Sequence, residues 1–375
     1  MQFIEIAGQD NLKQRLVAMV EENRTGHALL FCEAPGCGAL PLAIAMASYM
    51  LCESRRGGDS CGMCPTCNKT RKLIHPDLHF AMPVNSTKKV PSDKKPVSDH
   101  FIGEWREAVI NNPYLTEQEW YNTIETENKS GIIGVYEASL ILRKLSLQSF
   151  SGGPKFMMVW LPEKMNQEAA NKLLKLIEEP PADTYILMVS HSPEKIIPTI
   201  LSRCQIIRIP PIDREQLEGE LMEEFDLSGA EAGFWAKLSG GSLSKARELI
   251  AGSALQQQMD ILLARLLEGC ANRDLAKTIA FWEEVATLRR DDQKIFLEYT
   301  LEFLRRALMV AEGLPEIANV PPSGIEQSAF WAQKFKPAFY GRALGIINGA
   351  MEDIGRNVNS RYIFADLSNR FFLSL

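Results

Sequence analysis

The chain has 375 residues, of which 46% are hydrophobic and 23% charged, so it is an ordinary globular protein with room for two or three domains. Its net charge of −6 is spread over both signs without a long basic tract, which gives no general reason to expect tight nucleic-acid binding by this chain alone. The sequence begins without a signal-peptide pattern, and its longest nearly uncharged run, around Ala39 to Leu51, is too short to span a bilayer. We therefore expect a cytoplasmic protein without a membrane partner.

Five apolar runs of strand length recur in the first two hundred or so residues, with helical patterns between them. They are HALLFCEA (27–34), DLHFAMPV (77–84), KFMMVWL (155–161), TYILMVS (184–190) and CQIIRI (204–209). Their apolar residues are continuous rather than alternating, which is typical of strands buried on both faces of a parallel sheet. The sequence thus predicts an α/β domain over residues 1–212, in which helices cover the sheet.

The first of these runs leads into FCEAPGCGALPLAIAMA (31–47), which has the outline of a phosphate-binding loop. A working loop needs G-x-x-x-x-G-K-[S/T], because the lysine neutralises phosphates and the hydroxyl ligates Mg²⁺. The four defining positions are filled here by Glu33, Gly38, Ala39 and Leu40. Gly36 and Gly38 preserve the turn, but the lysine and the hydroxyl are absent and Glu33 adds a negative charge. An ordinary strand-to-helix turn is the alternative interpretation.

Four of the eight cysteines cluster in LCESRRGGDSCGMCPTC, at Cys52, Cys61, Cys64 and Cys67. The spacing C-x8-C-x2-C-x2-C suits a tetrahedral zinc ion, because two C-x-x-C turns bring four thiolates together. All four positions are sulfur, so no position is open for a catalytic water, and we predict a structural zinc module at about 52–67. A redox dithiol or four unligated thiols are the alternatives, although such crowded thiols would be prone to oxidation.

Residues at about 85–130 form an insertion in the predicted sheet domain. Its first part, NSTKKVPSDKKPVSDH (85–100), is polar, carries lysines and prolines, and has no periodicity, which predicts a mobile loop. The remainder returns to helical spacing with aromatic residues, and we expect it to pack on the sheet domain.

Strand patterns end near Asp213. The segments REQLEGELMEEF, AEAGFWAKL and SLSKARELIAG are short helical units punctuated by Gly229 and Gly240-Gly241, which predicts a small helical lid over residues 213–252. Beyond it, four longer segments, the first of them ALQQQMDILLARLLEGC, carry apolar residues at three-and-four spacing. They predict a separate all-helical domain over residues 253–375.

The segment from KFMMVWL to TILSRC (155–204) resembles the central part of the bacterial clamp-loader subunits of the AAA+ class. A strand leads into Met165-Asn166, then come the helix NKLLKLIEEPP, a second strand and the tripeptide Ser202-Arg203-Cys204. The stretch FIEIAGQDNLKQRL and the segment HPDLH (75–79) are similar to the same family, so the resemblance covers Phe3 to about Ile250. It implies an AAA+ α/β domain followed by a helical lid and an all-α collar domain that serves in oligomerisation.

The resemblance also shows which functional positions have changed. In active members an acidic pair before "MN" positions Mg²⁺, and these places hold Trp160 and Leu161 here. The lid arginine of active members corresponds to Ser244. Together with Ala39 and Leu40, these changes remove most of the charge stabilisation on which phosphoryl transfer relies. The resemblance therefore implies a catalytically degenerate subunit, with no ATP expected to be bound or hydrolysed.

Arg203 keeps its place in the tripeptide. In the family this arginine reaches across a subunit interface to the γ-phosphate held by a neighbouring ATPase, where it stabilises the charge that develops on the transferring group. The resemblance implies the same role for Arg203. A structural arginine that bonds a carbonyl at the sheet edge is the alternative.

The implied function is that of a non-hydrolysing clamp-loader subunit of the DNA polymerase III holoenzyme. The implied partners are the gamma/tau ATPase subunits and the delta subunit, with the sliding clamp and primed DNA reached through the assembled complex. Two alternatives stay open. One is an active gamma/tau-type ATPase, which Ala39, Leu40 and Trp160 disfavour, and the other is a zinc-bearing nucleic-acid-binding module, which the acidic charge balance disfavours.

Overall fold

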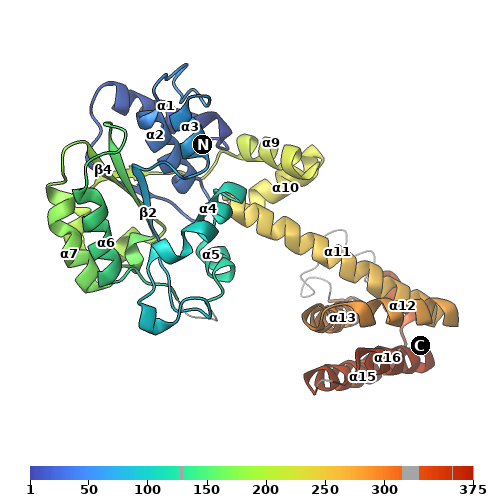
Figure 1. The fold of residues 1–375 in the computed structure, drawn as a ribbon. Helices are drawn as coiled ribbons and strands as arrows, with labels where there is room; N and C mark the ends of the chain where they lie inside the picture. Colours follow the sequence, from blue (N-terminus) through green and yellow to red (C-terminus); the bar gives the residue numbers. More distant parts are fainter. Residues whose placement is uncertain (127–129, 315–328, 357, 375) are drawn as a thin grey trace. The chain divides into compact units, whose positions relative to one another are not determined.

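The computed structural model describes residues 1–126, 130–314, 329–356 and 358–374 (Figure 1). The chain divides into two compact units, Met1–Ile250 and Ala251–Leu375. In the described ranges, no helix is both long enough and apolar enough to cross a membrane.

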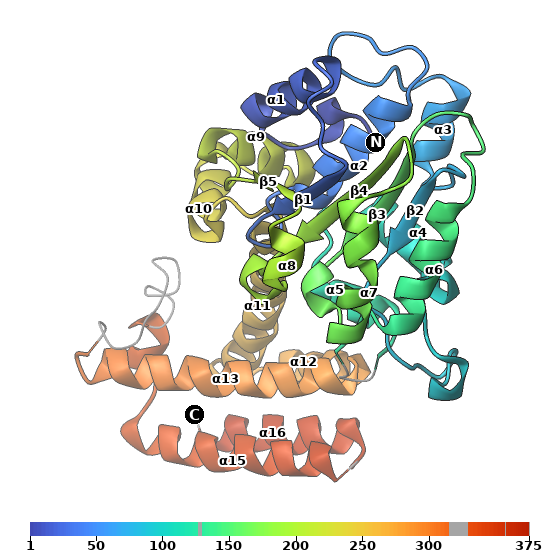
Figure 2. The same ribbon diagram turned by 90° about the vertical axis from the view of Figure 1, so that its left-hand side faces the viewer.

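The first unit is built on a five-stranded parallel sheet with the strand order β2-β3-β4-β1-β5 (Figure 2). The strands are β1 (Ala28–Cys32), β2 (Leu78–Ala81), β3 (Lys155–Trp160), β4 (Thr184–Ser190) and β5 (Gln205–Arg208). Each of them lies inside one of the five apolar runs, so the predicted parallel sheet is confirmed. β3 is buried at every residue because both faces of the sheet are covered.

Alternate residues of the strands enter two separate cores, as the period of a strand requires. In β3, Phe156, Met158 and Trp160 join one core, and Met157 and Val159 join the other. The helices that contribute to the first core are α1 (Asp10–Glu21), α2 (Ala39–Leu51) and α4 (Ile102–Asn111), and those of the second are α6 (Val135–Ser146) and α7 (Gln167–Glu178). The sheet thus forms the middle of three layers.

Side-chain caps fix where several of these helices begin. The side chain of Asn166 accepts a hydrogen bond from the backbone N–H of Ala169 at 2.8 Å and starts α7. Reciprocal capping boxes start two shorter helices, from Thr116 and Ser228. The remaining helices of this unit are α3 (Pro65–Arg71), α5 (Glu117–Thr123), α8 (Pro198–Leu201), α9 (Arg214–Phe225) and α10 (Gly229–Ser239), with short 3-10 turns at Phe3–Glu5, Ser92–Lys94, Ser98–Phe101, Pro162–Lys164 and Pro193–Lys195.

One predicted break is wrong. The segments SLSKARELIAG and ALQQQMDILLARLLEGC were expected to form separate helices, but they make a single helix, α11 (Leu243–Ala271), that continues through Gly252. A glycine inside a helix costs only about 1 kcal/mol relative to alanine, and the alanines and leucines on either side are strong helix formers. Gly252 is therefore tolerated without a break.

In its described residues, the second unit is built of helices joined by short turns, as predicted. Besides the later part of α11 it contains α12 (Leu275–Thr287), α13 (Arg290–Ala311), α15 (Pro337–Gly355) and α16 (Ser360–Ser374). Its core is rich in phenylalanine, with Phe281, Phe296 and Phe364 fully buried and in ring contact. Aromatic packing between these helices stabilises the unit.

The insertion packs on the first unit through two tryptophans. Trp105 of α4 and Trp120 of α5 are fully buried, and the ring centroid of Trp105 lies 5.2 Å from that of Trp120 and 5.2 Å from that of Trp160 at the end of β3. The stretch expected to be a mobile loop is itself anchored, because Val90 and Val97 are buried. The insertion is thus part of the core of this unit.

We predict that Trp105→Ala lowers the free energy of unfolding by about 3–5 kcal/mol, because it leaves a cavity between two other indoles. Trp105→Phe should cost clearly less, because the ring contacts are partly kept and Trp105 Nε1 has no hydrogen-bond partner among the described residues to lose. Urea denaturation followed by circular dichroism measures both variants. Equal losses for Ala and Phe would contradict the packing role.

Candidate functional site

The degenerate loop joins β1 to α2 at the carboxyl edge of the sheet, beside the point where the strand order reverses. Ligands of open α/β sheets bind at this point. Gly36 and Gly38 have φ angles of 84° and 108°, a region that residues with side chains rarely adopt. The turn that the sequence indicated is therefore formed, and it presents the first N–H groups of α2.

A carboxylate of the chain itself occupies the N terminus of α2. Oε2 of Glu33 accepts a hydrogen bond from the backbone N–H of Ala39 at 2.8 Å, and Oε1 lies 3.3 Å from Nε2 of His191. The side chains of Glu33 and His191 are only 4% and 9% exposed. A helix N terminus attracts anions, because its first N–H groups are unpaired and carry the positive end of the helix dipole. Glu33 thus supplies internally the negative charge that a phosphate brings to a working loop.

The residues that begin α11 close directly on this loop. Ser242 Oγ donates a hydrogen bond to the carbonyl of Pro35 at 2.7 Å, and the backbone N–H of Leu243 donates to the carbonyl of Gly36 at 3.0 Å. A Cβ atom on Gly36 would lie 2.6 Å from the hydroxyl oxygens of both Ser242 and Ser244. Gly36 is therefore needed for close approach as well as for its φ angle. Ser244, at which the resemblance implied the loss of a lid arginine, is buried and donates a hydrogen bond to the backbone carbonyl of Tyr114.

Tyr114 of the insertion connects three parts of this site. Its hydroxyl accepts a hydrogen bond from the backbone N–H of Ala7 at 2.8 Å, and its carbonyl accepts one from the hydroxyl of Ser244. A Cβ on Gly38 would lie 3.4 Å from its ring, and burial raises the pKa of Tyr114, so the phenol stays neutral. The sequence gives no sign of a role for Tyr114, because none of its contacts follows from a local pattern.

Apolar side chains occupy the two positions at which the resemblance implied the loss of an acidic pair. Trp160 and Leu161 are fully buried, and the Trp160 ring packs edge-on against His191, with centroids 6.2 Å apart. Glu163, two residues beyond the pair, accepts hydrogen bonds from the backbone N–H groups of His191 and Ser192 at 2.9 and 3.1 Å. Those contacts hold the carboxylate of Glu163, from the turn after β3, against the turn after β4.

The four clustered cysteines come together as the spacing predicted. Their sulfur atoms lie within 4.8 Å of one another, and the sulfurs of Cys61 and Cys67 are 3.8 Å apart. A tetrahedral ion with Zn–S bonds of 2.3 Å requires sulfurs about 3.8 Å apart, so this group fits one metal ion. Cys64 Sγ accepts a hydrogen bond from the backbone N–H of Cys67 at 3.3 Å and starts α3. Cys52 Sγ accepts a hydrogen bond from the backbone N–H of Cys61 at 3.2 Å.

The thiols of Cys61 and Cys67 differ in pKa because their surroundings differ. Hydrogen bonds from the backbone N–H groups of Met63 and Cys64 lower the pKa of Cys61 to about 6. Burial raises the pKa of Cys67 to about 12. Backbone donors thus favour the thiolate at the more exposed sulfur, and the buried sulfur is disfavoured as an anion unless a cation lies beside it.

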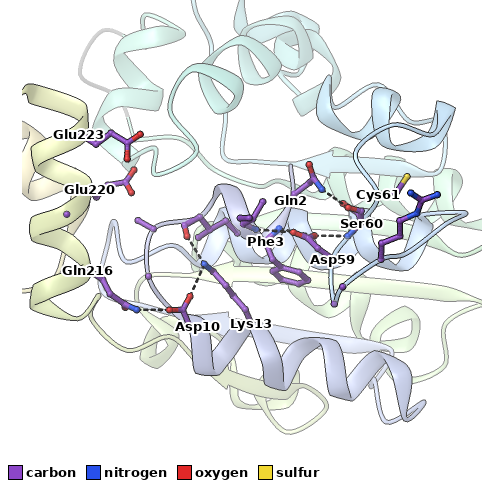
Figure 3. A pocket seen from close by; sticks show the side chains of 18 of the residues that line it. Gln2, Phe3, Asp10, Lys13, Asp59, Ser60, Cys61, Gln216, Glu220 and Glu223 are labelled. Carbon is purple, nitrogen blue, oxygen red and sulfur yellow. Dashed lines mark hydrogen bonds and ion pairs between the residues drawn. The ribbon is translucent and has the colours of Figure 1, made fainter.

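The cysteine loop is tied to the N-terminal segment beside a cavity of about 850 Å³ (Figure 3). Asp59 accepts hydrogen bonds from the backbone N–H groups of Phe3 and Ile4, both at 3.0 Å. Glu220 and Glu223 of α9 line the far side of this cavity, and burial together with the nearby Glu224 raises the pKa of Glu220. A cavity with this many carboxylates is unsuited to a phosphate ligand.

Arg203 lies just after α8, and its side chain is 33% exposed. Its Nη1 donates a hydrogen bond to the carbonyl of Thr199 at 3.0 Å. Its Nε lies 3.1 Å from Oε2 of Glu178, the last residue of α7, as an ion pair without hydrogen-bond geometry. The carbonyl bond is the one that the structural alternative anticipated. Glu178 was not singled out from the sequence, because its contact with Arg203 joins two separate helices.

Comparison with known proteins identifies the family of this chain. The model described as "DNA polymerase III, delta subunit" matches residues 8–213, more than half of the chain. The chain belongs to this family. A relative named DNA polymerase III subunit delta′ from Escherichia coli (strain K12) is 25% identical over 312 residues, covering 83% of this chain and 78% of the relative. The resemblance indicated by the sequence is thereby confirmed.

Two further relatives in this comparison are aligned over shorter stretches. Subunit delta′ of Yersinia pestis is 31% identical over 193 residues, which cover 51% of this chain and 44% of that protein. Subunit tau of Salmonella typhimurium is 25% identical over 221 residues, which cover 58% of this chain and 27% of tau. The shared part therefore spans less than half of either relative.

We predict that Glu33→Ala lowers the free energy of unfolding by about 1–3 kcal/mol, because the buried N–H of Ala39 loses its acceptor. Glu33→Gln should cost less, because the amide oxygen can still accept that bond. Glu194→Ala, at an exposed position of a neighbouring turn, is the matched control. Urea midpoints measure all three, and a Glu33→Ala variant as stable as the control would contradict the capping role.

Proposed function

We propose that this chain is the non-hydrolysing delta′ subunit of a DNA polymerase III clamp loader. In this role it helps to load the sliding clamp onto primed DNA, and it supplies Arg203 to the ATP held by a neighbouring subunit. The observation that carries the proposal is the contrast between two places. The chain's own phosphate loop is filled by Glu33, whereas Arg203 is partly exposed.

We expect no intrinsic ATP hydrolysis because this chain lacks the charged groups that act on the phosphates. Phosphoryl transfer requires cations around the transferring group, and the lysine and metal-binding positions hold Ala39, Leu40, Trp160 and Leu161. Glu33 repels an incoming phosphate at the remaining anion-binding feature, the N terminus of α2. The contacts of Ser242 and Leu243 with the loop further reduce the space for a nucleotide. ATP is therefore neither bound nor hydrolysed by this subunit.

The partners follow from the same role. An arginine that acts in trans needs a neighbour that holds ATP, and the gamma/tau subunits are the ATPases of the proposed complex. The similarity to a tau subunit supports a shared architecture between the two kinds of chain. The delta subunit, the sliding clamp and primed DNA complete the assembly, which is a hetero-oligomer, and the helical second unit is proposed as its collar.

Arg203→Ala should lower the DNA- and clamp-stimulated ATP hydrolysis of a loader reconstituted from gamma, delta and this chain. The expected fall in the total rate is only severalfold. An arginine finger contributes about 10³–10⁵ in rate, but it does so at the one ATP site that it serves. Arg208→Ala, at an exposed position on β5, is the matched control. Gel filtration must first show equal assembly of all variants. Unchanged hydrolysis by an intact Arg203→Ala loader would leave this arginine structural.

We also propose that Cys52, Cys61, Cys64 and Cys67 hold a structural Zn²⁺ ion. The sulfur separations support a tetrahedral site, and an all-sulfur donor set leaves no position for a reacting water. The ion would hold the loop that carries Asp59 against the N-terminal segment.

The purified chain should contain one zinc ion, measured by plasma mass spectrometry. Cys64→Ser should lose most of it and lower the melting temperature, because three thiolates bind the ion less tightly than four. Cys270→Ser is the control, because this buried cysteine lies in the second unit and outside the cluster. Zinc content that is absent, or unaffected by Cys64→Ser, would exclude the site.

A further inference from the structure

We propose that Glu178 is a positioning residue for Arg203, orienting its guanidinium toward the phosphate of the neighbouring subunit. This inference rests on the proposed function of Arg203. It adds Glu178, a residue of α7, to the group that would act on the neighbour's ATP. It also predicts that loss of Glu178 slows ATP hydrolysis, which loss of an ordinary surface ion pair would not do.

The two side chains project from elements that are held firmly. Glu178 ends α7, and Arg203 lies two residues beyond the end of α8. Ile177 and Ile200, one residue before Glu178 and three before Arg203, are both buried in the core beneath the sheet. The backbone on each side of the ion pair is therefore fixed by packing, and only the side chains can move.

The contacts leave part of the guanidinium available. A guanidinium has five N–H donors, and those of Arg203 make one hydrogen bond among the described residues, from Nη1 to the carbonyl of Thr199. Glu178 lies against Nε, at the stem end of the group. Phosphate oxygens are bound best by paired N–H groups at the outer end of the fork. Nη2 has no hydrogen-bond partner in the described part of the chain, and Nη1 uses only one of its two N–H groups, so donors at the outer end remain available for such a ligand.

The ion pair with Glu178 is strong enough to orient Arg203 and too weak to keep it from binding a phosphate. The side chains of Arg203 and Glu178 are 33% and 53% exposed, so solvent screens their attraction. A phosphate carries more charge than a carboxylate and would not be outcompeted by it. Restricting the arginine beforehand reduces the freedom it loses on binding, which favours the reacting complex. Removing Glu178 should therefore slow hydrolysis rather than accelerate it.

Glu179, the residue after Glu178, provides a matched control for the Glu178 variants. Glu179 has the same charge and is exposed, yet it makes no ion pair within the described ranges. An effect caused only by negative charge near the arginine would appear on changing either glutamate. An effect caused by contact with Nε would appear on changing Glu178 alone.

The test uses the loader reconstituted from gamma, delta and this chain, with clamp and primed DNA. The variants are Glu178→Ala, Glu178→Gln, Glu179→Ala, Arg203→Ala and the double variant Glu178→Ala/Arg203→Ala, each compared after equal assembly is shown. We expect both Glu178 variants to lower the rate at the site served by Arg203 roughly two- to fivefold, the range expected for an exposed pair, and the total kcat by less than Arg203→Ala does. KM for ATP should be unchanged because the neighbour binds the nucleotide. Glu179→Ala should match the native chain. The double variant should be no slower than Arg203→Ala, because Glu178 acts only through Arg203.

Three results would overturn the inference while leaving the proposed function in place. They are an unchanged kcat in both Glu178 variants, a raised kcat, and a double variant slowed by the product of the two single effects, each with Arg203→Ala still slow. If Glu178→Ala fails to assemble, Glu178→Gln decides, because it keeps the shape of the side chain. Unchanged hydrolysis with Arg203→Ala would instead remove the proposed function and this inference together.

Discussion

The hydrogen bond from the Ala39 N–H to Glu33 is the contact on which the rest of the first unit depends. A buried helix N terminus needs acceptors for its first N–H groups, and leaving one unpaired is costly. In a working phosphate loop the nucleotide satisfies this need, so the loop changes with its ligand. Here the acceptor belongs to the chain, which keeps β1, the loop and α2 in one arrangement. Ser242 and Tyr114 can then pack permanently against a loop of fixed shape.

The other substitutions at the site act in the same direction. A lysine at position 39 or an acidic residue at position 160 would need charged partners or a ligand when buried. Ala39 and Trp160 remove that need, and Trp160 gains ring contacts with Trp105 of the insertion. Contacts within the chain thus stand where a buried charge would need a bound ligand. Such agreement between separate positions is what a stable, ligand-independent fold requires.

The sequence predicted the parts of this protein that local patterns control. The five strands, the loop turn at Gly36 and the four-cysteine cluster follow from periodicity, glycine placement and spacing, which act over a few residues. The contact of Glu33 with His191, and that of Tyr114 with Ala7, join residues more than a hundred positions apart, and no local pattern carries them. The continuous helix α11 was missed for a different reason, because its two parts were assigned to different domains on either side of residue 252.

On the proposed function, the lack of a bound nucleotide in this subunit has a consequence for Arg203. Arg203 lies beyond β4 and α8, whose residues share a buried core with α7 on the face of the sheet opposite α2. On the proposed function no ATP binds at the chain's own loop, where Glu33 already accepts the hydrogen bond of the Ala39 N–H, so nothing in that core responds to ATP there. On the proposed function, the geometry of Arg203 is therefore constant through the cycle. Changes in its distance from the neighbour's phosphate must come from movement of the neighbouring subunit, which makes this chain the fixed side of the interface.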